Sequence, residues 1–181
     1  HSTFVIESPD GVRIATDYND YVRPTVLPDI ATMNHAHSTH YSLSPDPSIK
    51  YVLHGWADDE KPARIDLQYK DVRVRNVPTN IRTFEGGTER HGNSIFIFEV
   101  ANLCIAHLGH LHHTLTQQQL NEIGRVDIVL VRMRARDQDV IVVPSRGLVD
   151  PANHFREKFT MEIRQQHPNG AGPVGNQASR P

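Results

Sequence analysis

The segment "ATMNHAHSTHYS", residues 31–42, places His35, His37 and His40 close together in the chain. His35 and His37 are two positions apart, so at the end of a strand both side chains point to one face and can reach one metal ion. His40 lies a turn further along. Because imidazole is a frequent zinc ligand, this segment predicts a metal-binding loop.

A second group of histidines lies in "HLGHLHH", residues 107–113, directly after an apolar run. Two histidine clusters that each follow a strand favour one shared site. His107 is the exception, because it lies inside the predicted strand and fits a core residue with satisfied hydrogen bonds. Four further histidines fit no ligand spacing and are predicted to lie at the surface: His54, His91, His154 and His167.

The composition limits the classes of function. The chain has 181 residues and a net charge of −2, with lysines and arginines scattered among acidic residues. This length supports one domain with its own core, and the lack of a basic stripe argues against nucleic acid or an acidic membrane as a partner. No apolar run approaches the ~20 residues that span a bilayer. The oligomeric state stays open.

Two further features bear on compartment and reactivity. No signal-peptide pattern opens the chain, which favours the cytoplasm, although a leader ahead of His1 would leave the periplasm open. The single cysteine, Cys104, cannot form an internal disulfide and lies in the apolar run "LCIAHLG". We expect a buried, unreactive thiol rather than a nucleophile.

Short apolar runs between turn signals predict strands in the first part of the chain. "STFVIES" and "VRIATD" flank the turn "PDG", so residues 2–17 are expected to form a hairpin. "VRVRNVP" alternates, with Val72 and Val74 on one face, as in a half-buried strand. "NSIFIFEV" and "LCIAHLG" predict a second strand pair joined at "AN". Residues 44–63, rich in Pro and Asp, predict a loop with no more than one short helix.

One helix and a buried strand are predicted next. "TLTQQQLNEIG", residues 114–124, offers a threonine cap, Leu120 and Ile123 on one face, and Gly124 at the stop position. "VDIVLV", residues 126–131, is a nearly continuous apolar strand suited to the middle of a covered sheet. Strand pairs followed by a strand–helix–strand unit predict an α/β domain with helices packed on sheet.

Beyond residue 131 the sequence changes character and becomes net basic. "VIVVP", residues 140–144, can form a strand. The end of the chain, "HPNGAGPVGNQASRP", has too much Gly and Pro and too little apolar content to fold. We therefore expect one domain over residues 1–160 and a disordered tail over residues 161–181.

These motifs together resemble the metallo-β-lactamase-fold hydrolases, most closely the zinc-dependent branch related to ascorbate-6-phosphate lactonase. "HSTFVIESPDGVRIATD" is similar to the opening of that branch, and "HAHSTH" matches the family loop H-x-H-x-D-H at its three histidines. "GNSIFIFEVANLCIAHLGHLHHTLTQQQLNEIGRVDIVLV" resembles the stretch that carries a metal-bridging aspartate in relatives. The resemblance is clear to about residue 131. It implies an αββα sandwich that is incomplete or atypical at the C-terminus.

Three departures from the family pattern fall in the expected site. Thr39 stands where the family loop has aspartate, and His110 stands where the bridging aspartate is expected. Asn80 stands where relatives present another histidine ligand. The site is therefore rewritten, with two carboxylates and one histidine replaced and with His112 and His113 added.

The resemblance implies a metal-dependent hydrolase, in which a water activated by the metal attacks a small ester, lactone or phosphoester. His35 and His37 are the first candidates as ligands of the ion. His40 and His110 come next, and His113 is a further candidate. We expect zinc, as one ion rather than two, with other divalent metals open.

Asp17 would support the histidine loop from behind, as the aspartate that ends the second strand does in relatives. The alternative reading is a non-catalytic metal-binding or degenerate homologue that retains the scaffold. The loss of carboxylates at positions 39 and 110 favours this alternative, whereas the retained histidines favour the hydrolase. The sequence does not identify a catalytic side chain or the substrate.

Overall fold

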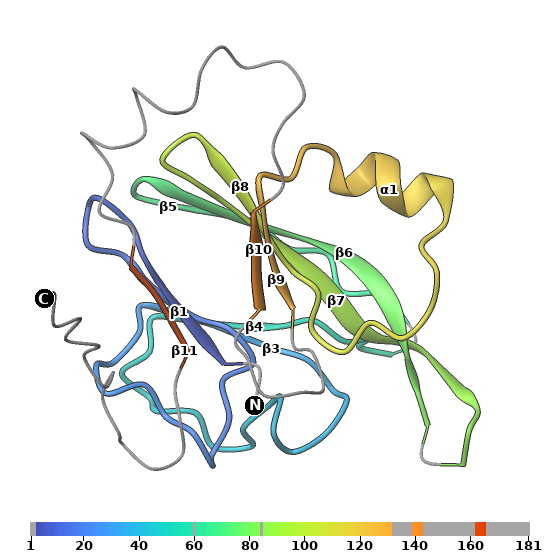
Figure 1. Ribbon diagram of the computed structural model, residues 1–181. Helices are drawn as coiled ribbons and strands as arrows, with labels where there is room; N and C mark the ends of the chain where they lie inside the picture. The colour runs from blue at the N-terminus through green and yellow to red at the C-terminus, as the bar shows by residue number, and fades with distance from the viewer. Residues whose placement is uncertain (1–2, 60, 84, 132–138, 143–161, 166–181) are drawn as a thin grey trace, which may run out of the picture.

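The computed structural model of this chain describes residues 3–59, 61–83, 85–131, 139–142 and 162–165. Two β-sheets face each other, and one helix covers the outer side of the second sheet (Figure 1). The predicted α/β sandwich is confirmed. Within the described residues, one helical layer of the αββα arrangement is present, on the second sheet.

The first sheet begins with the predicted hairpin. β1 (Phe4–Glu7) and β2 (Arg13–Ala15) pair antiparallel, and Gly11 takes the left-handed backbone (φ 75°) that the turn needs. β2 then pairs parallel to β3 (Ile30–Met33). Because parallel strands end at the same edge of a sheet, this pairing places Asp17 beside the segment that follows β3.

β4 (Tyr51–His54) corrects the sequence prediction of a loop over residues 44–63. It pairs parallel to β3 along its whole length. None of its four side chains is fully buried, so the apolar signal of a central strand is missing from the sequence. β4 is held by hydrogen bonds to β3, which is distant in sequence, and the Pro-rich segments around β4 favoured the prediction of a loop.

The second sheet has the order β10-β9-β8-β7-β6-β5 and is antiparallel except between β8 and β9. Its bounds are β5 (Asp66–Tyr69), β6 (Val72–Arg82), β7 (Thr88–Val100), β8 (Leu103–His107), β9 (Ile128–Val131) and β10 (Asp139–Val142). The predicted strand pair joins at Ala101 and Asn102, which both have positive φ. Val72 and Val74 are buried in β6 as their alternation predicts.

Opposite faces of the second sheet pack against different layers. Between the two sheets lies the largest apolar cluster, which includes Phe4, Ile14, Ile30, Val74, Phe98 and Ile105. On the outer face, Ile97 and Ala106 pack with Ile123 of the helix. Since side chains alternate along β8, His107 ends the row that faces the first sheet, two residues after Ile105.

The helix α1 (Gln117–Ile123) begins and ends where the sequence predicts. Thr116 accepts a hydrogen bond from the backbone N–H of Gln119, whose side chain in turn accepts one from the N–H of Thr116. Gly124 forms the C-terminal cap. Ile123 is buried, but Leu120 is 47% exposed, so the prediction of one apolar face is wrong at Leu120.

Two short strands lie in the C-terminal part of the chain. β10 pairs with β9, so part of "VIVVP" forms a strand as expected. β11 (Glu162–Gln165) pairs antiparallel with β1. It falls inside residues 161–181, for which the sequence predicts disorder, and that expectation is not met at these four residues. The remainder of the predicted tail lies outside the described residues.

Cys104 lies on β8 and is half-buried rather than buried. Burial raises the pKa of its thiol, which favours the protonated form, and its lack of reactivity stays a prediction. Of the helices that the described part of the chain contains, none is long and apolar enough to cross a membrane.

Candidate metal centre

Three imidazole rings meet where β3 and β8 end. The ring centres of His37 and His110 are 4.5 Å apart, those of His40 and His110 are 5.3 Å apart, and those of His37 and His40 are 5.7 Å apart. His37 and His40 come from the loop after β3, and His110 comes from the turn after β8. These three residues bring together the two histidine-rich segments of the sequence. We call His37, His40 and His110 the histidine cluster.

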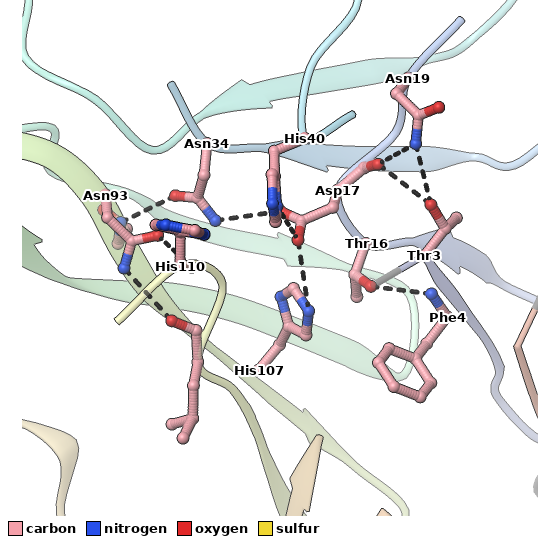
Figure 2. A network of polar contacts seen from close by, with 12 residues as sticks. Thr3, Phe4, Thr16, Asp17, Asn19, Asn34, His40, Asn93, His107 and His110 are labelled. Carbon is pink, nitrogen blue, oxygen red and sulfur yellow. Dashed lines mark hydrogen bonds and ion pairs between the residues drawn. The ribbon is translucent and has the colours of Figure 1, made fainter. Parts of the chain in front are cut away.

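His40 is held from behind by Asp17. Its Nδ1 lies 2.6 Å from Oδ2 of Asp17, and both side chains are buried (Figure 2). A carboxylate only accepts hydrogen bonds, so Nδ1 of His40 is the donor in this contact. The predicted contact between Asp17 and the histidine loop is confirmed. Its role in supporting a metal ligand stays a prediction.

The backbone at Asp17 explains how its carboxylate reaches the interior. Asp17 has a φ of 44°, a left-handed conformation that aspartate tolerates better than most residues. Its carbonyl oxygen accepts hydrogen bonds from the side chains of Thr3 and Asn19. The chain therefore turns sharply after β2, and the Asp17 side chain points between the sheets toward His40 (Figure 2).

His107 is a buried neighbour of the histidine cluster that sequence reasoning set aside as a core residue. It is 1% exposed, and its Nε2 lies 3.6 Å from Oδ2 of Asp17. Phe4 packs against its ring with centres 5.9 Å apart. The available signal was its spacing from Ile105, because a polar residue on an inward-facing row needs a polar partner.

His110 is kept neutral by its surroundings. Burial lowers its pKa, and the neighbouring His40 and His37 lower it further, to about 4, although Asp17 acts in the opposite direction. A neutral imidazole offers a lone pair without first losing a proton. His110 is therefore ready to act as a ligand across the neutral and mildly acidic range.

His35 has other neighbours, contrary to its predicted place as a first ligand beside His37. Its ring centre lies 5.4 Å from that of Tyr41 and 5.5 Å from that of Trp56, and its Nδ1 is 3.3 Å from Oε1 of Glu89. The reason is local. β3 ends at Met33, and residues 35–37 form bends. The rule that alternate side chains of a strand share a face therefore does not apply to them.

His113 contacts other groups, and its role as a ligand stays a prediction. Its Nε2 accepts a hydrogen bond from the backbone N–H of Asn80, and its Nδ1 lies 2.9 Å from the carbonyl oxygen of Thr114. Both ring nitrogens are therefore engaged. His112 packs against His113, with ring centres 5.4 Å apart.

The other histidines have mixed outcomes. His54 is exposed as predicted, and its ring stacks on Trp56 with centres 4.4 Å apart. His91 is part-buried, so it lies only partly at the surface. The side chain of Asn80, where relatives were expected to present a histidine, accepts a hydrogen bond from the backbone N–H of His91. His154 and His167 lie outside the described residues.

The donor set suits a single divalent ion in its chemistry and spacing. Two imidazoles bound to one tetrahedral zinc ion at ~2.0–2.1 Å have ring centres ~5 Å apart, which matches the histidine cluster. As the side chains stand, no group of three or more His, Cys, Asp or Glu in the described residues has its donor atoms placed to hold a metal.

The fold and the histidine cluster define a metallo-β-lactamase-like scaffold, and comparison with known proteins agrees. Residues 1–159 match the family described as Beta-lactamase superfamily domain, and the chain belongs to this family. The match does not single out the branch related to ascorbate-6-phosphate lactonase. No curated protein matches the chain.

The solved structures that are similar to the chain include two candidate hydrolases. One, from Thermotoga maritima, is described as a candidate zinc-dependent hydrolase of the metallo-β-lactamase superfamily; it is 28% identical, with a TM-score of 0.48 and coverage of 71% of this chain. The other, a candidate metal-dependent hydrolase from Parabacteroides distasonis, is 17% identical, with a TM-score of 0.46 and the same coverage. The chain spans 56% of the first protein and 64% of the second.

Proposed function

We propose that this chain is a metal-dependent hydrolase of the superfamily that holds one divalent ion, zinc, with His37, His40 and His110. The observation that carries the proposal is the meeting of three rings, one of them held by a buried carboxylate. Histidine ligands in metal sites are usually oriented in this way by a carboxylate or carbonyl group. The proposal replaces His35 and His113 in the ligand set expected from the sequence.

The charge of the site supports one ion rather than two. Two divalent ions ~3.5–4 Å apart repel strongly unless anionic ligands lie between or beside them. The resemblance to the family pattern implies that Thr39 and His110 stand where relatives have aspartates. Asp17 is already engaged with His40 and with the side chain of Asn34, so it does not replace a bridging carboxylate.

A bound divalent ion would lower the pKa of a water molecule toward ~7 and polarise the oxygen that gains charge during hydrolysis of an ester, lactone or phosphoester. The residues of the chain prepare the site for this chemistry. Burial and the neighbouring histidines lower the pKa of His110 to about 4, and Asp17 orients the ring of His40 by accepting a hydrogen bond from its Nδ1. A set of neutral imidazoles would leave the full charge of the ion acting on the substrate.

A second candidate function is metal binding without catalysis on a retained scaffold. It is favoured by the replacement of both carboxylates, which would otherwise help to orient an attacking water. The two candidates differ in turnover and agree in requiring the histidine cluster.

The test measures the hydrolysis of an aryl ester, a lactone and a phosphodiester. Metal-free protein, zinc-reconstituted protein and the His37→Ala variant are compared. The hydrolase proposal predicts turnover of at least one substrate that depends on zinc and is absent from His37→Ala. Zinc binding without turnover in all three assays would favour the non-catalytic alternative. Failure of the wild-type protein to bind zinc would contradict both.

A further inference from the structure

We propose that Asn34 and Asn93 form an amide bracket that holds the two histidine segments at a fixed distance and so positions His110 and the Asp17–His40 pair. The two side chains are 1% and 0% exposed, and they lie side by side between the loop after β3 and the turn after β8 (Figure 2). The effect of this bracket on metal binding rests on the proposed function, whereas the hydrogen bonds that form the bracket do not depend on it.

Asn93 fixes the turn that carries His110. Its Oδ1 accepts a hydrogen bond of 2.9 Å from the backbone N–H of His110, and its Nδ2 donates to the carbonyl oxygen of Leu108 at 3.2 Å. The same Nδ2 donates to Oγ1 of Thr79 on β6 at 2.7 Å. One buried side chain therefore ties residues 108–110 to the middle of the second sheet.

Asn34 ties the other histidine segment to the same sheet. Its Oδ1 accepts a hydrogen bond of 2.8 Å from the backbone N–H of Ser94, and its Nδ2 donates to Oδ1 of Asp17 at 3.2 Å. Its backbone N–H donates to the carbonyl oxygen of His40 at 3.1 Å, which closes the histidine loop on itself. Asn34 thus links the sheets and also sets the orientation of the carboxylate that holds His40.

Two glycines make room for this arrangement. A Cβ at Gly109 would lie 2.4 Å from Oδ1 of Asn93 and 2.5 Å from Nδ2 of Asn34. A Cβ at Gly55 would lie 2.6 Å from Oδ1 of Asn34. The backbone of both segments therefore packs directly on the two amides, and any side chain at position 109 would force them apart.

The consequence for the site is geometric. Histidine ligands must converge on one ion with distances that vary by only about 0.2 Å. The bracket determines the relative position of His110 on one segment and of His37 and His40 on the other, although it touches none of their rings in the contacts described above. Asn34 and Asn93 act as positioning residues, through backbone groups and through Asp17.

The first test compares Asn93→Ala with Asn76→Ala. Asn76 is a matched control, because it is buried in the same sheet and also makes three side-chain hydrogen bonds, to Ile65, Ala63 and Ser94. Both variants are expected to lower Tm by similar amounts. Zinc affinity, measured by competition with a chromophoric chelator well below Tm, is expected to fall on the order of 10–100-fold in Asn93→Ala and to stay unchanged in Asn76→Ala.

A second readout separates the bracket from metal binding. In metal-free protein, amide hydrogen exchange at His110 should be slow in the wild type and in Asn76→Ala, and fast in Asn93→Ala. If the wild type binds no zinc, the proposed function fails, and exchange at His110 still decides on the bracket. Slow exchange in Asn93→Ala, or wild-type zinc affinity in that variant after His110 has lost its protection, would overturn the proposal.

Gly109→Ala keeps the test decisive if Asn93→Ala does not fold. Gly11→Ala is its control, since both glycines have positive φ and a Cβ at Gly11 would meet nothing within 4 Å. Both substitutions are strained by a positive φ, and only the Cβ of Gly109→Ala meets the two amides. Loss of zinc affinity and of His110 protection in Gly109→Ala alone supports the bracket. Equal behaviour of the two variants overturns it.

Discussion

Nδ1 of His40 lies 2.6 Å from Oδ2 of Asp17, with both side chains buried between the sheets. The pair links the end of β2 to the loop after β3, which the parallel pairing of β2 and β3 brings to one edge. It therefore connects the architecture of the first sheet with the orientation of one member of the histidine cluster. The same carboxylate also accepts a hydrogen bond from Asn34.

Replacement of Asp17 by asparagine should weaken zinc binding on the order of 10–100-fold, because an amide of the same size cannot offer oxygens to both His40 and Asn34. Asp71→Asn is the control. Asp71 also accepts one hydrogen bond on each carboxylate oxygen, from Ser8 and Asp10, and its partners lie outside the histidine cluster. Chelator competition measures both variants, and equal affinities would show that the Asp17 carboxylate does not support a ligand.

His37→Ala should abolish zinc binding, because it removes the ring that lies 4.5 Å from His110 and 5.7 Å from His40. His112→Ala should bind zinc like the wild type, since the ring of His112 packs on His113. Zinc titration of the two variants at equal concentration provides the measurement. Retained binding in His37→Ala, or its loss in His112→Ala, would contradict the ligand assignment.

Local patterns in the sequence predicted much of the fold. The turn at Gly11, the alternation at Val72 and Val74, and the Thr116 cap are each decided by neighbours a few residues away. β4 was missed because its hydrogen bonds are to β3 and its side chains are only part-buried. Parallel pairing between distant segments leaves little trace in a single sequence.

The candidate site was predicted in part for the same reason. The spacing of the histidine clusters indicated a shared site, and His37, His40 and His110 do meet. His35 was assigned on the assumption that β3 continues, whereas it ends at Met33. The engagement of His113 with Asn80 depends on the path of the chain after β8, and no spacing rule reports that path.

The ionisation of His110 gives a prediction on pH. Its pKa is lowered to about 4 by burial and then by His40 and His37, against an ordinary value near 6.5. The unfolded chain therefore takes up a proton at this residue between pH 6.5 and 4 while the folded chain does not, so the contribution of His110 to stability falls as pH falls through that window. NMR titration of the metal-free protein, with His110→Gln to assign the signal, should give this lowered pKa. A value of 6.5 or higher would contradict it.

Arg75 should matter more for stability than its partly exposed position suggests. Its guanidinium donates to the backbone carbonyls of Glu122 and Ile123 at the end of α1 and to the carboxylate of Glu99. Removing hydrogen bonds from a charged donor costs about 1.5–3 kcal/mol, so Arg75→Ala should lower the free energy of unfolding by that amount. Arg64→Ala, which removes an exposed contact with Glu122, should change it by less than about 0.5 kcal/mol. Urea denaturation measures the free energy of unfolding of both variants. Equal values for Arg75→Ala and Arg64→Ala would contradict the proposed contribution of Arg75 at the end of α1.

The number of metal ions per chain tests the central claim most directly. Elemental analysis of protein prepared without a histidine tag, saturated with zinc and then freed of unbound metal, measures it. With His37, His40 and His110 as the proposed ligands, and with no carboxylate at positions 39 and 110, we expect one equivalent of zinc in the wild type and none in His110→Ala. Two equivalents in the wild type, or a full equivalent in His110→Ala, would contradict it.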